Sequence, residues 1–193
     1  MRSRIKKYIT SAVDNYTAIL DDDVLQEKIQ EVATKSIAAF RGDKKILLCG
    51  NGGSASDAQH IAAELSGKMY ANRPPLYAEA LHVNSSYITA VANDYGYDAT
   101  YSRMVEASGR KGDVMIGIST SGNSLNVVKA IQKANKIGML TVGFTGKEGG
   151  VMKGICDIML CVSSTNPARI QEGHILIGHI ISQLIEEEMF PDA

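Results

Sequence analysis

Short apolar runs alternate along this chain with longer segments in which apolar residues recur at helical spacing. A run of about five apolar residues between glycine or polar residues is typical of a buried strand, and a period near 3.6 is typical of a helix. We predict strands over residues 45–49, 77–83, 114–118, 138–144 and 155–162. We predict helices over residues 3–20, 24–40, 57–70, 85–91 and 99–108, from residue 125 onwards, and over 168–189.

The alternation of strands and helices determines the predicted fold class. Strands joined by helices form βαβ units, so we predict an α/β fold in three layers, with a doubly wound, five-stranded, mainly parallel sheet. Ligands of such sheets bind at the carboxyl ends of the strands. No linker or low-complexity segment interrupts the chain, so we expect a single domain over residues 1–193, with its α/β core over 42–193.

Two predicted helices precede the first strand and belong to no βα unit. The first has apolar residues at Ile5, Ile9, Val13, Tyr16 and Leu20, and three aspartates separate it from the second. Such helices either pack on the sheet of their own chain or contact a partner subunit, and the sequence leaves both alternatives open.

Composition and charge narrow the function classes. The 193 residues carry a net charge of −1, which gives no basic surface for a nucleic acid or a membrane. No apolar run approaches the length of a membrane span, and the basic N-terminus runs into aspartates rather than into the apolar core of a signal peptide. Three cysteines without a CxxC pair fit buried thiols in a reducing compartment, so we expect a cytoplasmic protein.

The segment that best indicates chemistry follows the third predicted strand. Residues 119–124 read Ser-Thr-Ser-Gly-Asn-Ser, six small residues with four hydroxyl groups, and a predicted helix begins directly after them. The first N–H groups of a helix have no partner within it, and the helix dipole favours an anion there. The pattern therefore indicates a phosphate-binding loop. The alternative is an N-cap that serves only its own helix, for which one hydroxyl would suffice.

A second loop of small residues follows the first predicted strand. Residues 50–55, Gly-Asn-Gly-Gly-Ser-Ala, match the dinucleotide pattern G-x-G-x-x-A. A nicotinamide cofactor would need an acidic residue at the end of the second strand, and Glu79 lies in the middle of that strand. The alternative is that the glycines allow backbone N–H groups to approach a sugar. Neither loop has the lysine of a P-loop.

Two predicted helices carry residue types that ligate metals. His60 and Glu64 are four residues apart and share one helix face, as in known metal-ligand pairs, although an exposed His–Glu ion pair has the same spacing. Gln171 and His179 are eight residues apart in the last helix and fall on roughly one side of it. The apolar neighbours of His179 also fit a histidine of the core. A shared site requires the two helices to bring these four side chains together.

Glycines interrupt this last helix. Gly173 and Gly178 each cost about 1 kcal/mol relative to alanine in a helix, and a close approach of another element would explain them.

These segments, together with Asn93-Asp94, occur in this order and near these spacings in the phosphoheptose isomerases, which are sugar isomerase (SIS) domain proteins. The chain resembles this family over nearly its whole length. The resemblance implies a flavodoxin-like strand order and the conversion of sedoheptulose 7-phosphate to D-glycero-D-manno-heptose 7-phosphate. This is an early step toward the activated heptose of bacterial surface polysaccharides, namely lipopolysaccharide or capsule. The resemblance also implies a homotetramer, in which the leading helices of residues 1–41 pack between subunits.

The resemblance further implies the site residues. It implies one zinc ion per subunit, held by His60, Glu64, Gln171 and His179, and it implies that Glu64 and His179 are the acid/base pair. The substrate-binding residues that it implies are Asn51, Gly52, Gly53, Glu64, Asn93, Asp94, Ser119, Thr120, Ser121, Ser124 and Gln171. Lys68 departs from the family, whose members tend to carry arginine at this position. A lysine keeps the charge but cannot bind an oxyanion in the bidentate manner of arginine.

Two other function classes compete with the isomerase. A non-catalytic SIS module, which binds a sugar phosphate or regulates replication initiation, is expected to lack the glutamate and the second histidine, and this chain has both Glu64 and His179. A nicotinamide-dependent oxidoreductase would leave the hydroxyl-rich loop without a function.

Overall fold

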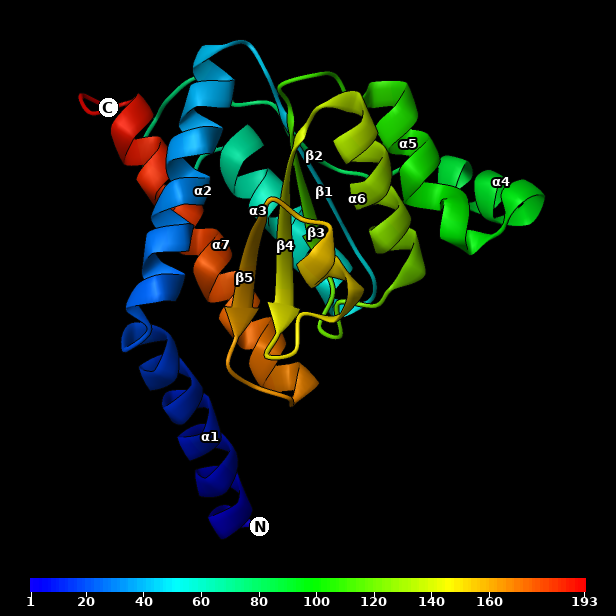
Figure 1. Cartoon of the computed structure of the whole chain (residues 1–193). Helices are drawn as coiled ribbons and strands as arrows, with labels where there is room; N and C mark the ends of the chain where they lie inside the picture. Colours follow the sequence, from blue (N-terminus) through cyan, green and yellow to red (C-terminus); the bar gives the residue numbers. More distant parts are fainter.

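In the computed structural model, which describes all 193 residues, five strands form one sheet with helices on both faces (Figure 1). The strands are β1 (Ile46–Gly50), β2 (Ala78–Ala80), β3 (Val114–Ile118), β4 (Leu140–Gly146) and β5 (Ile158–Val162). Their order is β2-β1-β3-β4-β5, and every pairing is parallel. The predicted doubly wound α/β fold and its flavodoxin-like order are confirmed.

The helices form the two outer layers. They are α1 (Arg2–Leu20), α2 (Asp23–Arg41), α3 (Gly53–Ser66), α4 (Ser85–Tyr95), α5 (Thr100–Ser108), α6 (Leu125–Ile137) and α7 (Pro167–Met189), with short 3-10 helices η1 (Tyr97–Ala99) and η2 (Gly150–Gly154). None of these helices has the length and apolarity that a membrane crossing requires.

Alternate residues of β1 show how the sheet joins the layers. Ile46 and Leu48 belong to a core cluster with residues of α2, α3 and α7, whereas Leu47 and Cys49 belong to a cluster with residues of α5 and α6. Successive side chains of a strand point to opposite faces, so one strand contributes to both cores. The sheet therefore holds α3 and α7 on the same face.

Several predicted boundaries were wrong. The helix predicted over 57–70 spans Gly53–Ser66. It begins early because Gly52, with a φ of +55°, lets the chain turn directly from strand into helix. Residues 93–95 form the last turn of α4 rather than a polar turn, and the helix ends at Gly96 with a φ of +84°. The strands predicted over 77–83, 138–144 and 155–162 are β2, β4 and β5 with shifted bounds.

The two leading helices differ in their packing. In α2, Leu25, Ile29 and Val32 are buried in the core cluster on the α3–α7 face. Helix α1 extends away from the sheet (Figure 1), and Ile5, Ile9 and Val13 are 53%, 59% and 55% exposed. The apolar stripe of α1 is thus not covered by its own chain.

Candidate active site

The two loops of small residues lie side by side at the carboxyl edge of the sheet. Gly50, the last residue of β1, is the partner of Ile118, the last residue of β3. The chain leaves β1 and β3 at the same level, and β2 lies on the other side of β1. This is the point where the strand order reverses, at which doubly wound sheets bind their ligands.

The loop after β3 presents clustered hydroxyl groups. Ser119 Oγ lies 2.9 Å from Ser124 Oγ and 3.4 Å from Ser121 Oγ. Ser124 occupies the N-cap position of α6, but its side chain makes no capping hydrogen bond. The hydroxyls therefore do not serve as the cap of their own helix, and they lie where the first N–H groups of α6 favour an anion.

A glycine turn holds this loop in place. Gly122 has a φ of +67°, and a Cβ there would collide with the backbone carbonyl of Gly149. The Gly122 carbonyl accepts a hydrogen bond from Met152 N at 3.1 Å, and the Thr120 carbonyl accepts one from Gly146 N at 3.0 Å. The end of β4 and the segment after it thus support the backbone of the hydroxyl-rich loop.

Asn51 ties the two loops together. Asn51 and Asn126 exchange two amide hydrogen bonds, each of 2.9 Å, and the Tyr97 hydroxyl donates to Asn51 Oδ1 at 3.0 Å. The Asn51 side chain is occupied by these bonds, while Gly52 and Gly53 are exposed. Sequence reasoning missed Asn126 and Tyr97. An amide in the first turn of α6 was the available signal for Asn126, whereas nothing in the sequence placed Tyr97 beside a residue 46 positions away.

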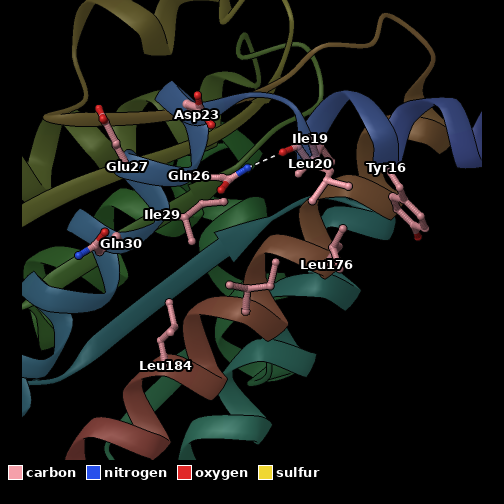
Figure 2. A pocket seen from close by; sticks show the side chains of 11 residues that line it. Tyr16, Ile19, Leu20, Asp23, Gln26, Glu27, Ile29, Gln30, Leu176 and Leu184 are labelled. Carbon is pink, nitrogen blue, oxygen red and sulfur yellow. Dashed lines mark hydrogen bonds between the residues drawn. The ribbon is translucent and has the colours of Figure 1, made fainter.

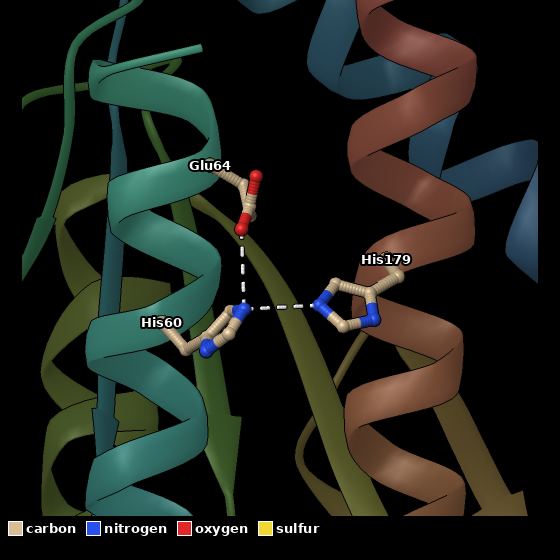
Figure 3. Close-up of side chains that lie close together, drawn as sticks. All are labelled: His60, Glu64 and His179. Atoms are coloured by element: carbon tan, nitrogen blue, oxygen red, sulfur yellow. Dashed lines mark hydrogen bonds and ion pairs between the residues drawn. The ribbon is translucent and has the colours of Figure 1, made fainter. Parts of the chain in front are cut away.

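Helices α3 and α7 bring three of the four predicted metal ligands together (Figure 3). His60 Nε2 lies 3.0 Å from His179 Nε2 and 3.1 Å from Glu64 Oε1. The ligand atoms of the three residues all lie within 4.8 Å of one another. His179 is therefore part of a cluster rather than a residue of the core, and His60–Glu64 is more than an isolated surface pair.

The side chain of Gln171, in the second turn of α7, lies against Gly53 at the start of α3. A Cβ on Gly53 would be 2.5 Å from Gln171 Nε2 and 2.8 Å from Gln171 Oε1, so the amide rests directly on the glycine backbone. The side chain of Gln171 makes no hydrogen bond to His60, Glu64 or His179. The sequence predicted this amide as a metal ligand. In the structure it lies between α3 and α7, the two helices that carry the other three predicted ligands.

The other predicted residues lie apart from this cluster. Asn93 and Asp94 are exposed at the end of α4, where Asn93 Nδ2 donates to Asp94 Oδ1 at 2.8 Å. Neither contacts the cluster or the two loops through a hydrogen bond. Lys68 is exposed in the segment after α3 and forms no ion pair.

A third titratable residue of α3 was not predicted. Asp57 lies one turn before His60, and its Oδ2 is buried without a hydrogen-bond partner. Burial raises the pKa of the Asp57 carboxyl to about 6, and the nearby His60 opposes this effect. The face of α3 toward α7 therefore carries a second carboxyl group.

The donor set of the cluster fits a divalent transition metal. Imidazole nitrogens and a carboxylate oxygen are the ligands that zinc takes in catalytic sites, which use three protein ligands and keep a position for substrate. Two imidazoles and one carboxylate meet here, with their ligand atoms within 4.8 Å of one another. The same residue types also transfer protons.

Comparisons with known proteins find a matching family and similar full-length relatives. A model of the SIS domain family matches residues 7–146. The phosphoheptose isomerase of Aneurinibacillus thermoaerophilus is 48% identical over 190 residues, which cover 98% of this chain and 96% of that protein.

Two solved structures are also similar. The structure of the phosphoheptose isomerase from Neisseria gonorrhoeae has a TM-score of 0.90 and 39% identity, and covers 96% of this chain and 98% of its own. That of a phosphoheptose isomerase from Francisella tularensis has a TM-score of 0.92 and 34% identity, with coverage of 96% and 97%.

Proposed function

The chain belongs to the SIS domain family and, within it, to the phosphoheptose isomerases, and we propose that it interconverts sedoheptulose 7-phosphate and D-glycero-D-manno-heptose 7-phosphate in heptose biosynthesis. The observation that carries this proposal is the meeting of Glu64 with His60 and His179. A carboxylate and two imidazoles from helices distant in sequence lie together, and a loop suited to phosphate follows β3 at the carboxyl edge of the sheet.

The reaction requires proton transfer at two neighbouring carbons. We assign Glu64 as the base that takes the proton from C1 of the ketose and returns a proton to C2, through an enediol. His179 moves the proton between the two oxygens. Each positioned acid or base contributes about 10²–10⁴-fold to the rate.

The substrate phosphate is assigned to the loop of Ser119, Thr120, Ser121 and Ser124. Binding there keeps the phosphate away from the reacting carbons, so its contribution is to orient the sugar. The backbone of Gly52 and Gly53 faces the sugar, and Asn51 supports this loop through its bonds to Asn126 and Tyr97. We also assign sugar contacts to Gln171 and, from the end of α4, to Asn93 and Asp94.

We assign the metal to His60, Glu64, Gln171 and His179, with zinc as the ion that fits two imidazoles, a carboxylate and an amide oxygen. When bound, such an ion polarises the sugar carbonyl and stabilises the oxyanion that develops on it. The unpaired thiols of Cys49, Cys156 and Cys161 fit a reducing compartment, in agreement with a cytoplasmic enzyme.

We further propose a homotetramer in which α1 packs on a neighbouring subunit. The exposed apolar stripe of α1 supports this, as does a groove of about 780 Å³ between α1, α2 and α7 (Figure 2). Tyr16, Leu20, Leu176 and Ile180 are among the residues that line the groove. Apolar side chains that are grouped and exposed on a single subunit are typical of an interface.

A direct assay tests the proposed reaction. The purified protein is incubated with sedoheptulose 7-phosphate, with and without a metal chelator, and the aldose product is followed. We expect aldose formation that stops with the chelator and returns when zinc is added. A folded, zinc-loaded protein that forms no aldose would disprove the isomerase assignment. Activity that survives complete metal removal would disprove the metal assignment alone.

A further inference from the structure

A buried ion pair lies at the end of α3 that is remote from the phosphate loop. Arg73 Nε donates to Glu186 Oε2 at 2.7 Å, and the two side chains are 0% and 4% exposed. Arg73 follows α3 by seven residues, and Glu186 lies near the end of α7. The pair therefore connects the two helices that carry His60, Glu64 and His179.

Arg73 closes the C-terminal end of α3. Its Nη2 donates to the carbonyl of Glu64 at 2.8 Å, and its Nη1 donates to the carbonyl of Leu65 at 2.9 Å. The last carbonyls of a helix lack partners within it, and a positive charge at that end also favours the helix dipole. The guanidinium thus binds the backbone of Glu64 itself.

Glu186 binds the backbone of the segment that follows α3. Its carboxylate accepts hydrogen bonds from the backbone N–H groups of Met69, Tyr70 and Ala71, at 3.1, 2.8 and 3.0 Å. Burial opposes ionisation, but these donors and Arg73 lower the pKa of Glu186 to about 2. Glu186 follows His179 by seven residues, about two turns of α7, so both lie on a similar side of that helix.

Three contacts lie along the length of the α3–α7 pair. Gln171 rests on Gly53 near the start of both helices. In the middle, a Cβ on Gly178 would be 2.6 Å from Ile61 Cγ1, so the helices approach closely beside His60 and His179. The Arg73–Glu186 pair forms the third contact, beyond Glu64. Without it, the turn that carries Glu64 would be attached to α7 only from one side.

We propose that Arg73 and Glu186 are positioning residues, which hold the Glu64 turn of α3 at the distance from α7 that brings the carboxylate to the two imidazoles. This inference rests on the proposed roles of Glu64 and His179. A buried ion pair is weak support for stability by itself, since well-packed apolar residues often replace one without loss. Five polar connections from Arg73 and Glu186 to backbone around Glu64 favour a geometric role instead.

The test compares Glu186→Gln and Arg73→Lys with the unaltered enzyme. Glutamine keeps the shape of Glu186 but loses its charge, and lysine keeps the charge of Arg73 but cannot address three acceptors at once. We measure zinc affinity by competition with a chromophoric chelator, and kcat and KM with sedoheptulose 7-phosphate. We expect zinc affinity and kcat to fall at least tenfold, with KM within about threefold because the phosphate loop is unchanged.

Asp113→Asn is the matched control. Asp113 forms a buried ion pair with Lys45 at 2.8 Å and accepts from the backbone of Lys45 and Arg110, but it lies at the amino ends of β1 and β3. Loss of the Asp113 charge should lower the thermal midpoint as much as Glu186→Gln and Arg73→Lys do, and should leave zinc affinity and kcat within twofold of the unaltered enzyme. A general loss of stability would instead change all variants alike.

Zinc affinity and kcat within twofold of the unaltered enzyme in both Glu186→Gln and Arg73→Lys would overturn the inference. If Glu186→Gln is not recovered folded, Glu186→Asp, which shortens the side chain by one carbon, is judged by the same readouts. If the unaltered enzyme binds no zinc, the metal assignment fails, and a fall in kcat without a change in KM tests the positioning role of Arg73 and Glu186. If the unaltered protein has no isomerase activity, zinc affinity tests that positioning role.

Discussion

Three histidines on two helices differ in what surrounds them. His60 and His179 meet at the surface cluster, whereas His174, five residues before His179, is fully buried and neither ring nitrogen has a hydrogen-bond partner. Its ring stands edge-on to Phe144, with centroids 5.8 Å apart. The core histidine that the apolar sequence around His179 suggested is therefore His174.

Burial of His174 predicts acid sensitivity. It lowers the pKa of His174 to about 4, whereas the histidine of the unfolded chain titrates near 6.5. The unfolded state thus binds more protons between these values, and the stability contribution is lost as the pH falls from about 6.5 toward 4. Relative to His174→Leu, the unaltered protein should lose about 2 kcal/mol of unfolding free energy between pH 7.5 and pH 5.

Urea denaturation of both proteins at the two pH values measures this difference. The comparison with His174→Leu removes the contributions of other groups, such as Asp57 and Glu186, which titrate in both proteins. An equal change in the two proteins would show that His174 finds a partner for its proton in the folded state.

Glu64 allows a second prediction at the scale of one residue. Glu64→Gln keeps the size of the side chain and removes its ability to take a proton. We expect kcat to fall by about 10²–10⁴-fold or more, with substrate binding still measurable by calorimetry. Glu187→Gln, an exposed change on α7, is the control and should keep full activity. Full activity of Glu64→Gln would remove the assignment of the base.

At the scale of elements, the junction of β1 and α3 decides the geometry of the site. The helix begins at Gly53, directly after the strand, and this early start places Gly53 under the amide of Gln171. Gly53→Ala would put a methyl group 2.5 Å from Gln171 Nε2 and must displace that amide. Alanine is the better helix former by about 1 kcal/mol, so the fold should persist.

We expect Gly53→Ala to lower kcat/KM at least tenfold while the thermal midpoint stays the same or rises. Steady-state kinetics and thermal unfolding measure the two effects. Gly154→Ala is the control, because no atom lies within 4 Å of a Cβ at that position. Unchanged kinetics in Gly53→Ala would mean that the position of Gln171 has no part in catalysis.

This junction also shows how far the sequence could predict the structure. The apolar runs predicted every strand, because buried parallel strands are continuously apolar, and the spacing of His60 and Glu64 predicted their shared face. The start of α3 could not be read from a loop of glycines and serines, since the φ of Gly52 has no signature beyond the residue type. The hydrogen bonds of Tyr97 to Asn51 and of Arg73 to Glu186 depend on tertiary packing, so no local sequence pattern predicts them.

At the scale of the whole molecule, α1 is the element that its own chain least explains. Only Asn15 and Ile19 are buried among its residues, and Asn15 Nδ2 donates to the carbonyl of Arg169 at 2.9 Å. Arg169 Nη1 also donates to the carbonyl of Tyr8 at 2.7 Å, so Arg169, two residues before Gln171, attaches α1 to α7, while the N-terminal end of α1 extends away from the sheet (Figure 1). Most of the stability of a helix in a protein comes from packing of its apolar face, so the exposed stripe needs a partner.

The proposed tetramer makes this partner another subunit, and one charge should disrupt it. Ile9→Glu places a carboxylate in the middle of the stripe, where burial against a neighbour would leave it unpaired. We expect light scattering after size exclusion to show dimers or monomers instead of tetramers, and activity to fall because α1 is attached to α7 beside Gln171. Lys7→Glu adds negative charge to the same helix away from the stripe and should leave the tetramer intact. A tetramer that persists in Ile9→Glu would exclude the α1 stripe from the interface, and a monomeric unaltered protein would exclude the tetramer itself.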